Sequence, residues 1–324
     1  MTRMLTGERP TGPLHIGHLF GTVANRVRLQ RSGVETMLVL ADYQVITDRE
    51  VTGDVAGNVR EIVLDYLAAG IDPDTATIFT HSAVPALHQL MLPFLSLVSV
   101  AELERNPTVK QELADSGRSM SGLLLTYPVH QAADILFCHA DVVPVGRDQL
   151  PHLELTRTIA RRFTQRYGPC FTEPEPVLSE APVVLGTDGR KMSKSNGNGI
   201  ALRASADETV RAIRSAKTDS DRVITYDPSS RPEVANLLLL ASLCTGAAPE
   251  TIADEIGSGG AGRLKAVVAD ALVEHLAPLR ARRALFAAEP GLVADILAQG
   301  NARANELADA TLRDVRELMG MTYC

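Results

Sequence analysis

The sequence predicts an α/β protein, in which a doubly wound, Rossmann-like parallel sheet is followed by a C-terminal all-helical domain. Strand and helix signals alternate in the first half of the chain, the strand segments are short apolar runs, and only helical periodicity continues beyond about residue 206. Strand–helix alternation implies right-handed βαβ units, and continuous apolar runs are typical of buried parallel strands. We therefore expect an α/β domain over residues 1–203 and a helical domain over residues 204–324.

The expected elements follow from apolar spacing and from the glycines that interrupt it. The strands are expected at residues 4–6, 36–41, 77–79 and 141–145, with a loop over residues 7–12. The helices are expected from about residue 17 to Gly33, over residues 54–69 and over residues 150–167, because apolar residues recur there at three- and four-residue spacing. In such sheets ligands bind at the carboxyl ends of the strands.

The composition is that of an ordinary globular protein, with 45% hydrophobic and 22% charged residues. The net charge of −7 argues against a general nucleic-acid or anionic-membrane binder but leaves room for one local basic surface. No signal-peptide core or membrane-spanning apolar stretch is visible. The four cysteines lie far apart, which favours reduced thiols over disulfides or a zinc site. We expect a cytoplasmic protein without zinc and without a membrane.

Two segments can bind phosphate. Residues 13–18, PLHIGH, follow the first strand and open a helix, whose N-terminus offers free N–H groups and partial positive charge to an anion. Residues 191–195, KMSKS, carry two lysines and two serines between flanking glycines, as expected of a mobile loop that donates to phosphate oxygens. Taken singly, the first could be two helix-capping histidines and the second a solvated loop.

The two motifs together, in this order, resemble class I aminoacyl-tRNA synthetases. Residues 6–12, TGERPTG, resemble the tryptophanyl-tRNA synthetases within this family. The resemblance implies that residues 1–203 are catalytic. The catalytic residues would be His15, His18, Lys191 and Lys194. The ATP-binding residues would be Arg9, Pro10, Thr11, Gly17, His18, Gly146, Arg147, Asp148, Lys191, Met192, Ser193, Lys194 and Ser195.

Residues 126–136, TYPVHQAADIL, and residues 143–149, VPVGRDQ, resemble the tryptophanyl-tRNA synthetases within that family. Tyr127, Gln131 and Asp134 share one helix face by their spacing. The resemblance implies that Asp134 accepts the indole N–H, which suits a side chain that only accepts hydrogen bonds. It also implies that Tyr127 and Gln149 hold the α-ammonium group. The remaining side chains of the tryptophan pocket would be Leu5, Gln44, Gln131, Ile135, Val143 and Val145.

Three positions depart from the commonest bacterial pattern. Gln131 stands where many members carry methionine, Gln44 where many carry histidine, and Leu5 where some carry phenylalanine. The pocket is therefore expected to be more polar. These departures leave a tyrosine–tRNA ligase open as an alternative, and also a catalytically specialised paralogue that binds or regulates. A small-molecule nucleotidyltransferase is a third alternative, against which the intact KMSKS segment argues.

The resemblance also implies the partners of the protein. ATP with Mg²⁺, L-tryptophan and tRNA(Trp) would be the substrates, a homodimer the assembly, and residues 204–324 the domain that reads the anticodon. Arg211, Arg214 and Lys217 recur every three residues, so they share a helix face that either meets tRNA phosphates or is an ordinary solvated surface.

Overall fold

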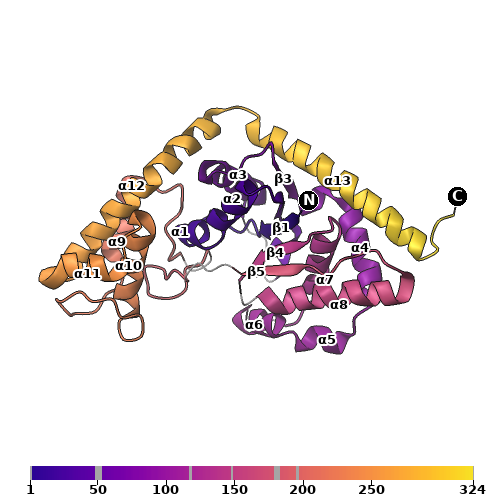
Figure 1. Ribbon diagram of the computed structural model, residues 1–324, viewed down its shortest axis with the longest axis horizontal. Coiled ribbons are helices and arrows are strands. Elements are labelled where there is room, and N and C mark those ends of the chain that lie inside the picture. The colour runs from indigo at the N-terminus through magenta and orange to yellow at the C-terminus, as the bar shows by residue number, and fades with distance from the viewer. Residues whose placement is uncertain are drawn as a thin grey trace.

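The computed structural model describes residues 2–47, 53–116, 119–146, 149–178, 183–194 and 197–323. A five-stranded sheet is surrounded by helices, and two long helices close the chain (Figure 1). The strands are β1 (Arg3–Glu8), β2 (Glu35–Leu40), β3 (Ala76–Thr80), β4 (Val142–Val145) and β5 (Glu175–Leu178). The helices up to β5 are α1 (Ile16–His18), η1 (Leu19–Val23), α2 (Ala24–Arg31), η2 (Tyr43–Ile46), α3 (Val55–Ala69), η3 (His81–Ala83), α4 (Pro85–Leu95), α5 (Val100–Arg105), α6 (Pro107–Ser116), α7 (Gly122–Leu136) and α8 (Leu150–Tyr167). Those after β5 are α9 (Ala206–Ser215), α10 (Pro232–Thr245), α11 (Pro249–Ile256), η5 (Gly257–Gly259), α12 (Gly260–Ala288) and α13 (Leu292–Leu318).

The sheet is parallel throughout, in the order β3-β2-β1-β4-β5. β2 and β3 lie on one side of β1, and β4 and β5 lie on the other. The chain therefore leaves the carboxyl ends of β1 and β4 in opposite directions. In doubly wound sheets this switch point is where ligands bind. The predicted fold class, including the four expected strands and the helical C-terminal segment, is confirmed.

Alternating strand residues fill two separate hydrophobic layers. On β2, Leu38 and Leu40 pack into a core shared with α2 and α3, whereas Met37 and Val39 pack into the core beneath α4, α7 and α8. This alternation follows from the two-residue side-chain period of a strand. Because helices cover both faces of the sheet, a ligand can reach the strands only at the edges of the sheet.

The C-terminal helices lie on the α/β layer at both ends. Helix α12 packs against α9, α10 and α3, and α13 returns to pack against β3 and α4, so that the two long helices span the molecule in Figure 1. A Cβ on Gly300 of α13 would lie 1.9 Å from the carbonyl oxygen of Ile78 on β3. Only glycine permits this close approach of helix to strand.

Three local features differ from the expectations. β1 extends through Glu8, so the loop before the first helix is shorter than expected. β5 was not predicted, because Pro176 within it argues against a strand; the proline is tolerated because β5 lies at the sheet edge. The first helix carries one π-helical turn, η1, directly after His18. In the described parts of the chain no single helix is long and apolar enough to span a bilayer. The pair Pro232–Thr245 and Pro249–Ala288, bent by 111°, reaches that length and composition only when taken together.

Candidate active site

The HIGH turn forms a compact helix start. His15 is the N-cap of α1, and its backbone N–H donates to Nδ1 of His18 at 3.2 Å, with the two ring centroids 3.7 Å apart. A Cβ on Gly17 would lie 3.0 Å from Nδ1 of His15 and 3.5 Å from the sulfur of Met192. Gly17 therefore lets the KMSKS segment approach the turn closely, and the structure brings the two motifs together.

Backbone pairing joins the two motifs. The N–H of Ile16 donates to the carbonyl of Ile200 at 2.9 Å, and the N–H of Leu202 donates to the carbonyl of Leu14 at 2.9 Å. This short antiparallel bridge places the chain that follows KMSKS directly beside the HIGH turn. Asn198, which is buried, accepts from the N–H of Ser193 and donates to the carbonyl of Lys191, and thereby shapes the loop from inside.

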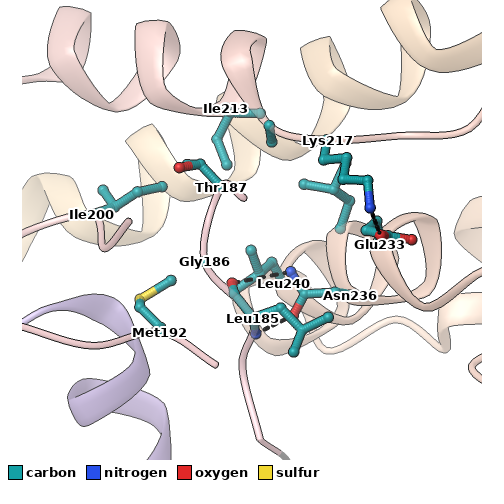
Figure 2. Close-up of a pocket in the computed structure, with 12 residues that line it drawn as sticks. Leu185, Gly186, Thr187, Met192, Ile200, Ile213, Lys217, Glu233, Asn236 and Leu240 are labelled. Carbon is teal, nitrogen blue, oxygen red and sulfur yellow. Dashed lines mark hydrogen bonds and ion pairs between the residues drawn. The ribbon is translucent and has the colours of Figure 1, made fainter. Parts of the chain in front are cut away.

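The hairpin that carries KMSKS is anchored on the helical segment. Asn236 of α10 both accepts from the N–H of Leu185 at 2.8 Å and donates to its carbonyl at 3.2 Å, as Figure 2 shows for the small pocket between them. The N–H of Lys217 donates to the carbonyl of Thr187. The Lys217 ammonium lies 2.7 Å from a Glu233 oxygen. One of the three basic residues expected to face tRNA is thus engaged within the chain.

The largely buried carboxylate of Glu8 lies beside the positive charges of the site. Oε2 of Glu8 lies 3.5 Å from Nζ of Lys194 and 3.9 Å from Nε2 of His18, and Oε1 lies 3.1 Å from Arg26. Lys194 also donates to the carbonyl of Arg9 at 3.2 Å. The second lysine of KMSKS is thereby held over the carboxyl end of β1.

The protonation states follow from burial and from this charge cluster. Burial raises the pKa of Glu8, but the charges of Lys194 and Arg26 outweigh it and lower the pKa to about 2. Burial lowers the pKa of His15 to about 3 and that of His18 to about 4. At neutral pH both histidines are therefore uncharged and can each present a ring N–H to a phosphate.

The residues expected to line the indole pocket meet at the other side of β1. Leu5, Ile135 and Val143 belong to one buried cluster, with Val145 packed against it. Asp134 is buried on the neighbouring turn of α7. Gln44, at the carboxyl end of β2, has a buried side-chain nitrogen without a hydrogen-bond partner among the described residues, which fits the more polar pocket expected from the sequence.

Tyr127 is oriented by a buried histidine. Its hydroxyl lies 2.8 Å from Nε2 of His152, and Nδ1 of His152 lies 3.3 Å from the Asn106 amide nitrogen. Because the amide nitrogen only donates, Nδ1 accepts and Nε2–H points at the tyrosine oxygen. Asn106 and His152 thus fix the direction of the Tyr127 hydroxyl.

The other expected site residues differ in burial and in the contacts they make. Lys191 is exposed, in contrast to Lys194. Arg9 pairs with Glu112 of α6 at 3.2 Å, and the N–H of Gln149 donates to the carbonyl of Gly146 at 3.0 Å. Pro10 is buried, and the N–H of Thr11 donates back to Arg9. Gln131 is half-buried on α7. The expected ATP ligands Arg147, Asp148 and Ser195 lie outside the described residues.

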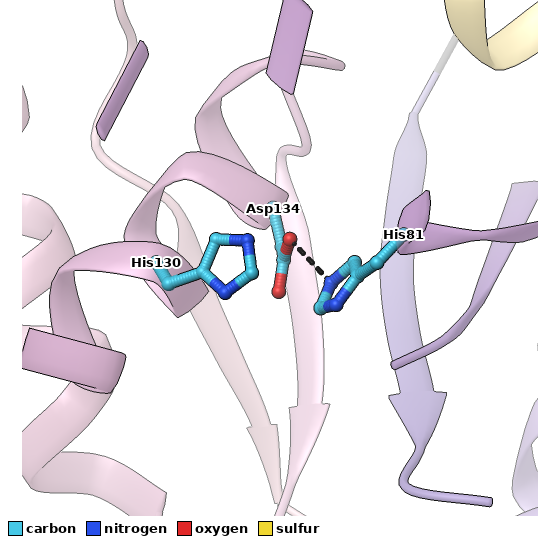
Figure 3. Close-up of side chains that lie close together, drawn as sticks. All are labelled: His81, His130 and Asp134. Atoms are coloured by element: carbon cyan, nitrogen blue, oxygen red, sulfur yellow. Dashed lines mark ion pairs between the residues drawn. The ribbon is translucent and has the colours of Figure 1, made fainter. Parts of the chain in front are cut away.

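Sequence reasoning missed Glu8 and a group of histidines beside Asp134. Nε2 of His81 lies 2.7 Å from Oδ1 of Asp134, and the ring of His130 lies 4.6 Å from that of His81, as Figure 3 shows. Glu8 and His81 each stand at the carboxyl end of a strand, which is the edge where ligands of this fold bind. That position was the signal that could have found them.

Comparisons with known proteins agree with this geometry. Residues 1–277 match the model of the family described as tRNA synthetases class I (W and Y). The chain is 40% identical to tryptophan–tRNA ligases of Streptococcus pyogenes and Lactococcus lactis, covering 99% of this chain and 98% of each relative. It superposes on a Campylobacter jejuni tryptophanyl-tRNA synthetase, complexed with ADP and tryptophan, with a TM-score of 0.84, 30% identity and coverage of 98% and 100%. The chain therefore belongs to the class I aminoacyl-tRNA synthetases of the tryptophan and tyrosine subclass, within the tryptophanyl-tRNA synthetase family.

Proposed function

We propose that this tryptophan–tRNA ligase works in two steps at the carboxyl edge of β1. A carboxylate oxygen of L-tryptophan attacks the α-phosphorus of ATP, and the bond to the β-phosphate oxygen breaks and releases pyrophosphate. The terminal ribose hydroxyl of tRNA(Trp) then attacks the acyl carbon, and AMP leaves. The chemistry needs no covalent enzyme intermediate, so the chain contributes positioning and charge stabilisation. Mg²⁺ would enter with ATP as part of that substrate.

The observation that carries the proposal is the convergence of Lys194 and the HIGH turn on one point. Lys194 is held beside His18 by Glu8, and His15 opens the adjacent helix. A triphosphate at this point would meet one ammonium group, two neutral ring N–H donors and the N-terminus of a helix. Lys194 can exchange the Glu8 carboxylate for a phosphate without leaving the site.

The same edge offers an acceptor for indole. Asp134 is buried next to the apolar cluster around Leu5, Ile135 and Val143. Indole has a single donor, and a buried carboxylate is its natural partner. A substrate without that donor would leave the carboxylate unpaired, so this contact supports discrimination beyond what the shape of the pocket gives. Tyr127, oriented by His152, and Gln149 would hold the ammonium group.

The other residues and partners expected from the family remain part of this proposal. Arg9, Pro10, Thr11, Gly146, Arg147, Asp148, Met192, Ser193 and Ser195 would complete the ATP site, with Lys191 joining when the loop closes. Residues 204–324 would contact tRNA, and two copies of the chain would form a homodimer in the cytoplasm. The exposed Arg211 and Arg214 of α9 support a basic patch on that segment.

The absence of tryptophan from the chain makes the amino-acid site easy to test. Because the protein contributes no indole fluorescence, the change in tryptophan emission on titration with protein reports binding. Asp134→Ala should weaken tryptophan binding strongly and leave ATP binding close to wild type, whereas Asp254→Ala on the exposed surface of α11 should change neither. Wild-type kcat/KM for tryptophan in Asp134→Ala would show that Asp134 is not the indole ligand.

A further inference from the structure

Asp134 belongs to a buried cluster with His81 and His130, and this cluster holds more potential metal-ligand atoms than recognition of indole requires. His81, His130 and Asp134 are buried, with exposed fractions of 0%, 4% and 3%. Each offers one ligand atom, and the three atoms lie within 4.8 Å of one another. His81 belongs to η3, and His130 and Asp134 lie on successive turns of α7; in Figure 3 the Asp134 carboxylate lies between the two imidazole rings.

The closest pair of this cluster is not satisfied by its own contact. Nε2 of His81 lies 2.7 Å from Oδ1 of Asp134, yet neither atom has a hydrogen-bond partner of acceptable geometry among the described residues. The two atoms are at hydrogen-bonding distance without a hydrogen-bonding direction. Unpaired polar atoms at such depth are costly, and a cation shared between them would satisfy both.

A further histidine, His88, lies outside this cluster and fixes the tautomer of His130. Nε2 of His88 lies 2.7 Å from the carbonyl of His81, and Nδ1 of His88 lies 2.9 Å from Nε2 of His130. A carbonyl only accepts, so His88 donates from Nε2 and accepts at Nδ1. His130 therefore donates from Nε2.

The remaining nitrogen of His130 can then act as a ligand. With the Nε2 proton of His130 in the hydrogen bond to His88, Nδ1 of the same tautomer carries the lone pair. A histidine that donates the N–H of its other ring nitrogen to a neighbour is the usual arrangement around a bound metal.

We propose that His81, His130 and Asp134 bind one divalent transition-metal ion of the Zn²⁺ or Co²⁺ class. Two imidazole nitrogens and one carboxylate suit such ions and leave a fourth position open. Ligand atoms about 2.0–2.2 Å from one ion lie about 3–3.5 Å apart, so the side chains need only small shifts.

Because Asp134 is shared, the ion and tryptophan exclude each other; this competition, unlike the metal site itself, rests on the proposed function. With Asp134 coordinated, indole loses its acceptor. The ion therefore lowers the fraction of protein that can bind tryptophan, in the manner of a competitive inhibitor.

The metal is tested on the full-length protein after removal of bound ions with a chelator. Titration with Co²⁺ in the absence of tryptophan should produce visible d–d absorption that saturates at one ion per chain, and Zn²⁺ should abolish it. His88→Ala should weaken Co²⁺ binding by about 10- to 100-fold, because it removes the hydrogen bond to a ligand. His81→Gln and His130→Gln should weaken it more, and His275→Gln on α12 should match wild type.

Circular dichroism should show that the variants fold. If either His81→Gln or His130→Gln does not fold, the other one tests the site. No saturable absorption, or equal affinity in His130→Gln and wild type, would overturn the metal site. Rising tryptophan should raise the apparent Kd for Co²⁺ in proportion. If Co²⁺ binds and the ligand variants lose it but tryptophan has no effect, the metal site stands and the indole contact of Asp134 fails. If tryptophan supports ATP–pyrophosphate exchange but Co²⁺ does not bind, the proposed function stands and the metal site is overturned.

Discussion

Replacing Glu8 by glutamine removes the charge that holds the active-site cations together and keeps the shape of the side chain. The Glu8 carboxylate faces Lys194 at 3.5 Å, His18 at 3.9 Å and Arg26 at 3.1 Å. Arg26 is buried and also bonds the Tyr66 hydroxyl at 2.8 Å. Glu8→Gln leaves that guanidinium without a carboxylate.

The pKa of Glu8 gives the size of the effect. It is lowered from 4.5 to about 2, and a shift of that size corresponds to about 3 kcal/mol of stability. Breaking one partner of a buried ion pair costs a similar amount, about 3–5 kcal/mol. A carboxyl with a depressed pKa stabilises the fold at pH values above its unfolded pKa. That stabilisation is lost as the pH falls from 4.5 towards about 2.

Urea unfolding followed by circular dichroism measures the difference. At pH 7 the free energy of unfolding of Glu8→Gln should be about 3 kcal/mol below wild type, and the gap should narrow below pH 4.5. Glu104→Gln, at an exposed position of α5, is the control. Amide exchange of the loop at Lys194 should also quicken. A difference that does not depend on pH, or that falls within about 0.5 kcal/mol of zero at pH 7, would refute the account of this network.

Lys194→Ala should lower kcat for adenylate formation by about 10²- to 10³-fold with little change in the tryptophan KM, since a cation that follows charge onto pyrophosphate acts in the transition state. Lys191→Ala should cost less, because that side chain is exposed; single-turnover kinetics measure both, and a larger loss for Lys191→Ala would reverse their roles. Gly300→Ala should destabilise the protein by several kcal/mol, because the new Cβ would meet the Ile78 carbonyl oxygen at 1.9 Å. The control Gly262→Ala has open space around it in α12 and should be neutral or stabilising by about 1 kcal/mol; equal melting temperatures for the two variants would contradict the close approach of α13 to β3.

Much of the fold was predictable because the local signals agree with the tertiary structure. The apolar run at 36–41 became the buried strand β2, and Gly70, with φ of 106°, ends α3 where only glycine fits easily. β5 was missed because Pro176 argues against a central strand, and the sequence does not indicate that this strand lies at the edge of the sheet. The return of α13 onto β3 depends on Gly300, whose partner is far away in the sequence.

The site residues that belong to sequence motifs were predictable, whereas those that join the site through tertiary contacts were not. The HIGH and KMSKS segments were both expected to bind ATP, and the bridge between Ile16 and Ile200 brings them together. Nothing local indicates that Glu8 pairs with Lys194, or that His81 touches Asp134, because both contacts join elements distant in the chain. The burial that makes His18 neutral is likewise a property of the folded protein.

Amino-acid-dependent ATP–pyrophosphate exchange tests the central claim most directly. The purified chain, with ATP and Mg²⁺, should catalyse exchange that depends on L-tryptophan, and L-tyrosine or L-phenylalanine should support far less. The basis is the buried Asp134, which we propose accepts the single donor of indole beside the apolar cluster of Leu5, Ile135 and Val143. Exchange with tyrosine equal to or above that with tryptophan, or no exchange with either by a protein that binds ATP, would contradict the account.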